Sequence, residues 1–299
     1  MSVLAPSLPA VSSPVPRSSP STIGNVLRFC RRNPLVAIGA LVVLVWIVAA
    51  LAAPLLAPYG PLTQKVTDRL KPPTLAHLFG TDALGRDILS RVIFGARISI
   101  PVGVAVVVVA LAVGGSVGAV AGYGPGWLDT ALMRLTEMVM AFPIIILAMM
   151  IAAALGAGLD HAIAALVAVS WPRYARVMRG LVLSIKENEY VLASRAMGGS
   201  SGHVLLRAVL PNCLAPAVVI ATLDLGGAIL TFSGLSFLGL GSPPPAPEWG
   251  AMVAAGTQSF DQWWVSAFPG AAILTLVMAF NFVGDGVRDA LDPRLRRRL

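Results

Sequence analysis

The sequence contains few residues whose spacing would support covalent chemistry. Its three histidines are far apart, and its two cysteines, Cys30 and Cys213, match no metal-binding or redox spacing. The metalloprotease pattern H-E-x-x-H is absent. The phosphate-binding pattern G-x-x-x-x-G-K-[ST] is also absent, because none of the three lysines follows a glycine. We therefore expect no catalytic residue, no cofactor or metal site, and no nucleotide-binding loop in this chain.

Asp224 is the one acidic residue deep inside an apolar segment of helical length. A charge in lipid is costly, so this side chain is expected to face the interior of a helix bundle or water. One interpretation is that Asp224 lines a pore and attracts a cationic group. The other, which we favour, is a structural hydrogen bond to a partner chain. Arg134 and Glu137, at i and i+3, are predicted to form a local ion pair.

A long polar segment follows Arg173 and ends near Asn212. Arg173, Arg176 and Arg179 are spaced by three residues, which predicts a shared helix face. Residues 190–197 favour a short helix, and the next two residues are glycines, which break it. Gly198 stands where this helix ends, so we expect it to adopt a positive φ. A serine at 200 or 201 is expected to cap a second short helix ending at Pro211. Such a pair of helices is either a solvated loop lying on lipid headgroups or a docking element for a soluble partner.

The composition identifies the class of protein that carries these residues. The chain has 299 residues, of which 57% are hydrophobic and 12% are charged, and its mean hydropathy is +0.81. Soluble globular chains are about 25% charged. The sequence therefore predicts an all-α, polytopic membrane protein, and it argues against a disordered chain, a disulfide scaffold or a soluble enzyme. The net charge of +8 comes with no basic patch interleaved with aromatic residues, so we expect no nucleic-acid partner.

Six segments are predicted to cross the membrane, since a span needs about 20 apolar residues. The fourth is short and needs a snorkelling arginine at its end to qualify. The predicted spans are residues 35–57, 98–122, 128–155, 161–174, 215–238 and 262–284.

The distribution of lysine and arginine predicts the orientation. Six spans leave both termini on one side, and placing them in the cytoplasm puts 16 of the 22 Lys and Arg residues there. The remaining six lie in an extended first external loop. We expect a multi-pass protein of the cytoplasmic membrane with both termini inside. The arginines at 294 and 296–298 are expected to bind anionic lipid.

Two further segments have open interpretations. Gly114, Gly115, Gly118 and Gly122 form a strip that permits close helix packing, within this chain by preference or at a subunit seam. The proline-rich segment 242–250 is expected to be extended on the outside. Trp249, Trp263 and Trp264 suit the outer membrane interface or a contact with an extracytoplasmic protein.

Four long segments in the right order carry a resemblance to a known family. The segment EYVLASRAMGGSSGHVLLRAVLPN (189–212) resembles the cytoplasmic loop shared by permease subunits of ATP-binding cassette importers. That loop has a Glu-Ala-Ala start, a glycine three residues beyond it and a Leu-Pro end. Here Leu192 stands in the acidic position and Ser194 in that of the second alanine. Residues 77–100, 234–252 and 280–296 resemble the second permease of dipeptide and oligopeptide importers.

The resemblance implies a type I importer permease core that works with other chains. These are a homologous permease, two ATPase subunits that hydrolyse ATP, and an extracytoplasmic substrate-binding protein. It implies import of di- or oligopeptides, or alternatively of nickel, glutathione or D-dipeptides. The residues expected to couple the core to the ATPases are Tyr190, Leu192, Ala193, Ser194, Ala196, Gly198, Ser200, His203, Leu210 and Pro211, and Asp224 is the possible pore-lining residue.

The expected organisation follows from the spans and the resemblance. It comprises a disordered, basic cytoplasmic tail (1–33), a first span with the external loop (34–97), a core of five spans (98–290) containing the coupling loop (184–212), and a basic tail (291–299). An ion-coupled secondary carrier is the competing class, but it needs more buried ionisable groups than Asp224 and often internal repeats.

Overall fold

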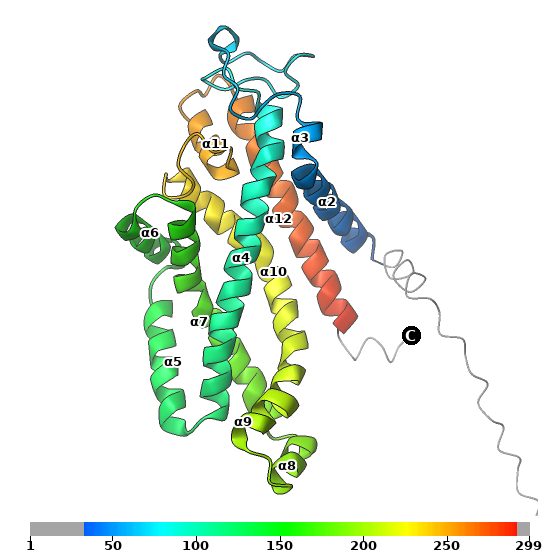
Figure 1. The fold of residues 1–299 in the computed structure, drawn as a ribbon, viewed down its shortest axis with the longest axis vertical. Coiled ribbons are helices and arrows are strands. Elements are labelled where there is room, and N and C mark those ends of the chain that lie inside the picture. The colour runs from blue at the N-terminus through cyan, green and yellow to red at the C-terminus, as the bar shows by residue number, and fades with distance from the viewer. Residues whose placement is uncertain (1–32, 292–299) are drawn as a thin grey trace, which may run out of the picture.

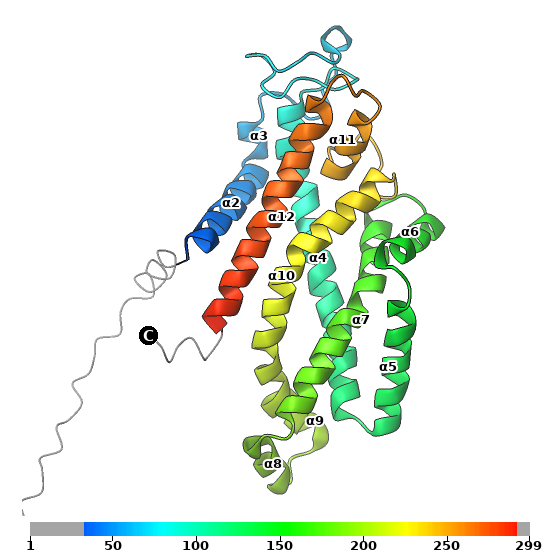
Figure 2. The same ribbon diagram turned by 180° about the vertical axis from the view of Figure 1, so that it is seen from behind.

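The computed structural model describes residues 33–291, and these form a bundle of helices without named strands (Figures 1 and 2). The two expected tails lie almost wholly outside the described residues. The helices are α2 (Pro34–Leu51), α3 (Ala53–Leu56), α4 (Ile88–Tyr123), α5 (Gly126–Met140), α6 (Ile144–Leu155), α7 (Leu159–Ile185), α8 (Glu189–Ala196), α9 (Ser201–Val204), α10 (Leu210–Phe237), α11 (Trp249–Gly256) and α12 (Trp264–Leu291). A 3-10 turn (Val66–Asp68) and a π-turn, η2 (Leu205–Val209), complete the list.

Four helices of the described chain are long and apolar enough to cross a membrane. They are α2, α4, α12 and the continuous run Ser201–Phe237 that ends in α10. The pair α5 and α6 is a fifth candidate. The helix α7, with 27 residues, is about 40 Å long and covers the predicted fourth span, but its acidic and basic residues lower its hydropathy.

The second and third predicted spans differ from the structure for local reasons, and the fourth and fifth belong to longer helices, Leu159–Ile185 and Ser201–Phe237. The second begins at Ile88 rather than at 98, because the Asp87 carboxylate accepts a hydrogen bond from the Ser90 backbone N at 2.8 Å and caps the helix. The third is not one helix, because α5 and α6 meet at 89°. Pro143 explains the break: its ring disfavours helical geometry at Phe142 and removes a backbone donor.

The expected shared face of three arginines is wrong. All three lie in α7, which continues to Ile185, so the polar loop is shorter than the sequence indicates. Residues six positions apart in a helix point about 120° apart, so Arg173 and Arg179 face different neighbours. The Arg179 guanidinium donates to both Asp129 carboxylate oxygens of α5, at 2.5 and 2.6 Å. The predicted ion pair between Arg134 and Glu137 is confirmed at 3.1 Å.

The glycine strip packs within the chain. A Cβ added at Gly114 or Gly118 would collide with the backbone carbonyl of Trp171 or Ala175 in α7. At Gly122 the added atom would lie 3.0 Å from the Arg179 carbonyl oxygen. The favoured interpretation is therefore confirmed, since these glycines let α4 and α7 approach closely.

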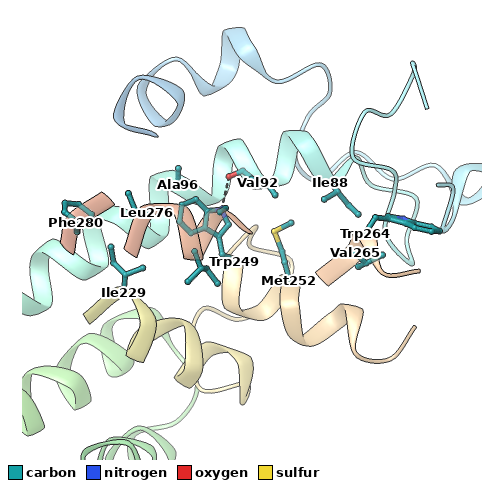
Figure 3. Packing of buried hydrophobic residues seen from close by; sticks show 12 residues of the cluster. Ile88, Val92, Ala96, Ile229, Trp249, Met252, Trp264, Val265, Leu276 and Phe280 are labelled. Atoms are coloured by element: carbon teal, nitrogen blue, oxygen red, sulfur yellow. Dashed lines mark hydrogen bonds between the residues drawn. The ribbon is translucent and has the colours of Figure 1, made fainter. Parts of the chain in front are cut away.

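The expected position of two tryptophans at the membrane interface is wrong. Trp249 is fully buried in the cluster of Figure 3, where its indole Nε1 donates to the Val92 carbonyl oxygen at 2.9 Å. Trp264 is also buried, so that Trp263 alone of these three tryptophans is exposed. The absence of a side chain at Gly95 explains the burial of Trp249, because a Cβ there would lie 2.5 Å from the indole Nε1.

Glu248, the residue before Trp249, connects the helices α4, α10 and α11. Its carboxylate caps α11 by accepting from the Gly250 and Ala251 backbone N atoms, both at 2.9 Å. It also accepts from the Ser236 hydroxyl of α10 and lies 3.5 Å from the Ser99 hydroxyl of α4. Complete burial raises the pKa of the Glu248 carboxyl above its ordinary value.

Candidate functional site

The helices α8 and α9 form a small knob at one end of the bundle, opposite the loop 57–87 (Figures 1 and 2). We call residues 184–212 the coupling segment. Val191 in α8 and Val204 in α9 are both fully buried, and they pack with Met178 and Val182 of α7. The knob is therefore fixed to the bundle by two apolar side chains, while most of its polar residues face outward.

Gly198 ends α8 in the conformation that its position requires. Its φ is +85°, in the left-handed region. The Gly198 backbone N donates to the Arg195 carbonyl oxygen at 2.9 Å, and the Gly199 N donates to that of Ser194 at 3.1 Å. These two bonds define a Schellman motif, in which glycine is the preferred residue. The expected positive φ at this position is confirmed.

The second helix of the segment does not end at Pro211. The Ser200 hydroxyl caps its start by accepting from the His203 backbone N at 3.4 Å, as predicted. The helix then passes through the π-turn η2 and continues as α10. Pro211 lies in the first turn of α10, and the change of hydrogen-bond register in η2 accommodates its missing N–H.

Most of the residues predicted for coupling share an outward position. Tyr190, Leu192, Ala193, Ala196, Gly198, Ser200, His203 and Pro211 are exposed, whereas Ser194 and Leu210 are half-buried. The sequence analysis missed Met197, the residue that follows α8, whose side chain is 83% exposed. It also missed Arg195, which donates to the Tyr123 hydroxyl at 3.2 Å and lies 5.0 Å from the centre of its ring. The apolar Val191 and Val204 in a polar segment could have indicated the two anchors.

Asp224 of α10 and Arg173 of α7 form an ion pair. The Arg173 Nη1 atom lies 2.7 Å from Asp224 Oδ1, which joins α7 to α10. The two side chains differ in accessibility, with 64% of Arg173 and 14% of Asp224 exposed in the isolated chain. The sequence analysis identified Asp224 but not this partner.

A cavity of about 270 Å³ opens beside this pair. Its walls come from α4, the α5–α6 bend, α7 and α10. Ser170, Tyr174 and Thr231 also line it, and the remaining lining is apolar, with Phe142 from the bend. Gly227 lies one turn after Asp224, and a Cβ added there would meet no atom within 4 Å. The cavity thus combines one negative group, one positive group and apolar walls.

Two segments of the chain match families of known proteins. Residues 114–297 match the family described as "Binding-protein-dependent transport system inner membrane component". Residues 21–73 match a second family, "N-terminal TM domain of oligopeptide transport permease C".

Three relatives illustrate the range of names among similar proteins. A dipeptide transport system permease protein of Alkalihalophilus pseudofirmus is 38% identical, covering 96% of both chains. A probable D,D-dipeptide transport system permease protein of Escherichia coli is 42% identical over 88% of each chain. A glutathione transport system permease protein of Pectobacterium atrosepticum is 42% identical over 90% of each chain.

Proposed function

Because the chain belongs to the family of binding-protein-dependent transport system inner membrane components, we propose that it is a permease subunit of an ATP-driven peptide importer. It is a membrane component without enzymatic activity of its own, and it works with other components of a transport system. Di- and oligopeptides are the proposed cargo, because several relatives are named for dipeptide or peptide transport. Glutathione and D-dipeptides are alternatives that the names of other relatives favour.

The coupling segment is the observation that carries the mechanism. The sequence has no phosphate-binding loop, so the energy of ATP must arrive through a contact with another chain. The exposed knob, anchored through Val191 and Val204, supports a contact of this kind. We propose that two ATPase subunits engage the permeases through such knobs, that a homologous permease completes the pathway, and that an extracytoplasmic binding protein delivers the cargo.

Asp224 is proposed to line the translocation pathway. A charged side chain within a spanning bundle faces protein, water or a counter-ion rather than lipid. The cavity beside Asp224 and the outward-facing Arg173 support a pathway on this side of α7 and α10. The alternative of a hydrogen bond to a partner permease finds less support, because Asp224 already has a partner in its own chain.

Uptake by the reconstituted system tests the function. The chain would be co-expressed with the second permease, the ATPases and the binding protein from its own gene neighbourhood. We expect ATP-dependent uptake of a labelled dipeptide into proteoliposomes, and no uptake when the phosphate-binding lysine of the ATPases is replaced. Uptake of glutathione or nickel, with no uptake of any peptide, would reassign the cargo.

Cysteine labelling tests the proposed orientation, with both termini inside. In a Cys30→Ser background, the remaining native cysteine, Cys213, is buried. Two exposed residues serve as matched reporters for the two ends: Leu75, which is 98% exposed in the loop 57–87, and Met197, which is 83% exposed at the end of α8. A membrane-impermeant maleimide added to intact cells should label Leu75→Cys and leave Met197→Cys unlabelled. The reverse pattern would invert the orientation.

A further inference from the structure

The ion pair between Arg173 and Asp224 lies where a bound molecule can reach it, which a purely structural ion pair does not require. It sits at the wall of a cavity, and the Arg173 side chain is 64% exposed rather than enclosed. A charge pair within a membrane bundle is stable while the two groups satisfy each other. A ligand that separates them must therefore offer a counter-charge to both groups at once.

From this geometry we propose that Arg173 and Asp224 form a subsite that opens for zwitterionic cargo, such as a short peptide with free termini. The proposal rests on the proposed function and adds a chemical criterion to it. The cargo ammonium group binds the Asp224 carboxylate, and the cargo carboxylate binds the Arg173 guanidinium. One ion pair within the protein is then exchanged for two between protein and cargo, with no change in net charge.

Cargo with a single charge binds less well, because it can pair with only one of the two groups. A cation alone would pair with Asp224 and leave Arg173 without a counter-charge, and an anion alone would leave Asp224 unpaired. The cost is larger for an anion, because it leaves the mostly buried Asp224 (14% exposed) without a counter-charge, than for a cation, because the Arg173 side chain is 64% exposed and stays hydrated. Two separate groups, placed on different helices, therefore discriminate a zwitterion from either ion.

The size of the cavity agrees with short cargo. A volume of about 270 Å³ is close to the lower limit of ligand pockets, which is about 300 Å³. The apolar lining next to the charged pair suits peptide side chains of varied structure, since apolar contact makes few directional demands. Ser170, also on α7, places a hydroxyl group at the cavity, where it can bond the peptide backbone.

Weak binding to the assembled transporter tests the proposal. Permeases and ATPases in nanodiscs, without the binding protein, would be mixed with L-alanyl-L-leucine, its N-acetyl derivative or its C-terminal amide. Saturation-transfer NMR detects contact at millimolar concentration. We expect the free dipeptide to bind about tenfold more tightly than either blocked form, since each blocked form loses one charged hydrogen-bonding pair.

Variants of Arg173 and Asp224 distinguish a cargo-binding role of the pair from a purely structural one. Asp224→Asn should favour the N-acetyl form over the amide, and Arg173→Gln should show the opposite preference. The exchange variant, Arg173→Asp with Asp224→Arg, keeps a pair if single variants fail to assemble, and it should still prefer the free dipeptide. The matched control replaces both Arg134 and Glu137 by Gln, which removes an exposed ion pair in α5 and should leave the preference unchanged.

Equal signals from all three probes, no signal from any, or unchanged preferences in the variants would overturn the proposal. Uptake of dipeptide by the complete wild-type system is measured in parallel. Normal uptake without a preference at this site would remove the subsite but retain the proposed function, whereas absent uptake of every peptide would remove the function itself.

Discussion

Gly198 gives the sharpest test of the coupling segment, because its substitution strains the backbone without a steric clash in the described chain. A Cβ added there meets no atom within 4 Å, so no steric clash contributes. The φ of +85° is the source of the cost. Left-handed geometry costs an L-residue about 1–2 kcal/mol, less for Asn, and branching at Cβ makes Val worse than Ala. We expect the damage to rise in the order Asn, Ala, Val.

The strain from a substitution at Gly198 should destabilise the knob and not the helix bundle. Gly198 closes the Schellman motif that joins α8 to α9, whereas Val191 and Val204 hold both helices to α7. A strain of about 2 kcal/mol changes the population of the native knob about 30-fold. Gly198→Val should therefore reach the membrane in normal amount but weaken association with the ATPases or abolish hydrolysis stimulated by cargo.

Co-purification with the ATPases and hydrolysis in proteoliposomes measure this outcome. Gly202→Ala is the matched control for Gly198→Ala, because it adds the same atom to the same segment, also in open space, but at a helical position without a positive φ. Equal defects at Gly198 and Gly202 would attribute the loss to surface contact rather than strain. Normal coupling in Gly198→Val would refute the role assigned to this loop.

Three further outcomes follow from the packing. Gly227→Leu should fill the cavity and block uptake while assembly persists, and Gly270→Leu, in open space on α12, should not, as measured by dipeptide uptake. Gly118→Val should lower the melting temperature through a strain of about 1–3 kcal/mol, because its Cβ meets a backbone carbonyl. Gly115→Ala, whose Cβ would lie 3.4 Å from a flexible methionine side chain, should be tolerated. Because burial raises the pKa of Glu248 above 4.5, its protonation stabilises the fold at low pH. The melting temperature of the purified protein should fall as pH rises from 4.5, the ordinary value of the group, through that raised pKa, and Glu248→Gln should flatten this dependence.

Local features of the sequence were sufficient to predict local structure. Apolar length indicated the membrane spans, and a helix followed by two glycines predicted the positive φ at Gly198. The start of α4 was missed although its signal is local, since Asp87 caps three residues before Ser90. The break at Pro143 is likewise explained by proline geometry that the apolar run concealed.

Features that depend on distant segments were not predictable from one sequence. Trp249 is buried because Gly95, far away in the chain, leaves space for its ring. Arg173 pairs with Asp224 because of the rotational phase and axial level at which α7 and α10 pack, and neither quantity is encoded in a local pattern. The three-residue spacing of the arginines was therefore correctly read as helical, but the expected shared face was wrong, because Arg173 pairs with α10 and Arg179 with α5.

The coupling segment and the charged cavity are connected by the same two helices. The segment begins where α7 ends, and α10 continues from its second short helix. Arg173 lies 12 residues before Ile185, which is about 18 Å along α7, and Asp224 lies about 35 Å along the helix that starts at Ser201. A displacement of the knob therefore acts on both helices that carry the ion pair. Because the charges are on separate helices, relative movement of α7 and α10 alters their distance directly. This connection would let the state of the ATPases control whether the pair is closed on itself or open to cargo.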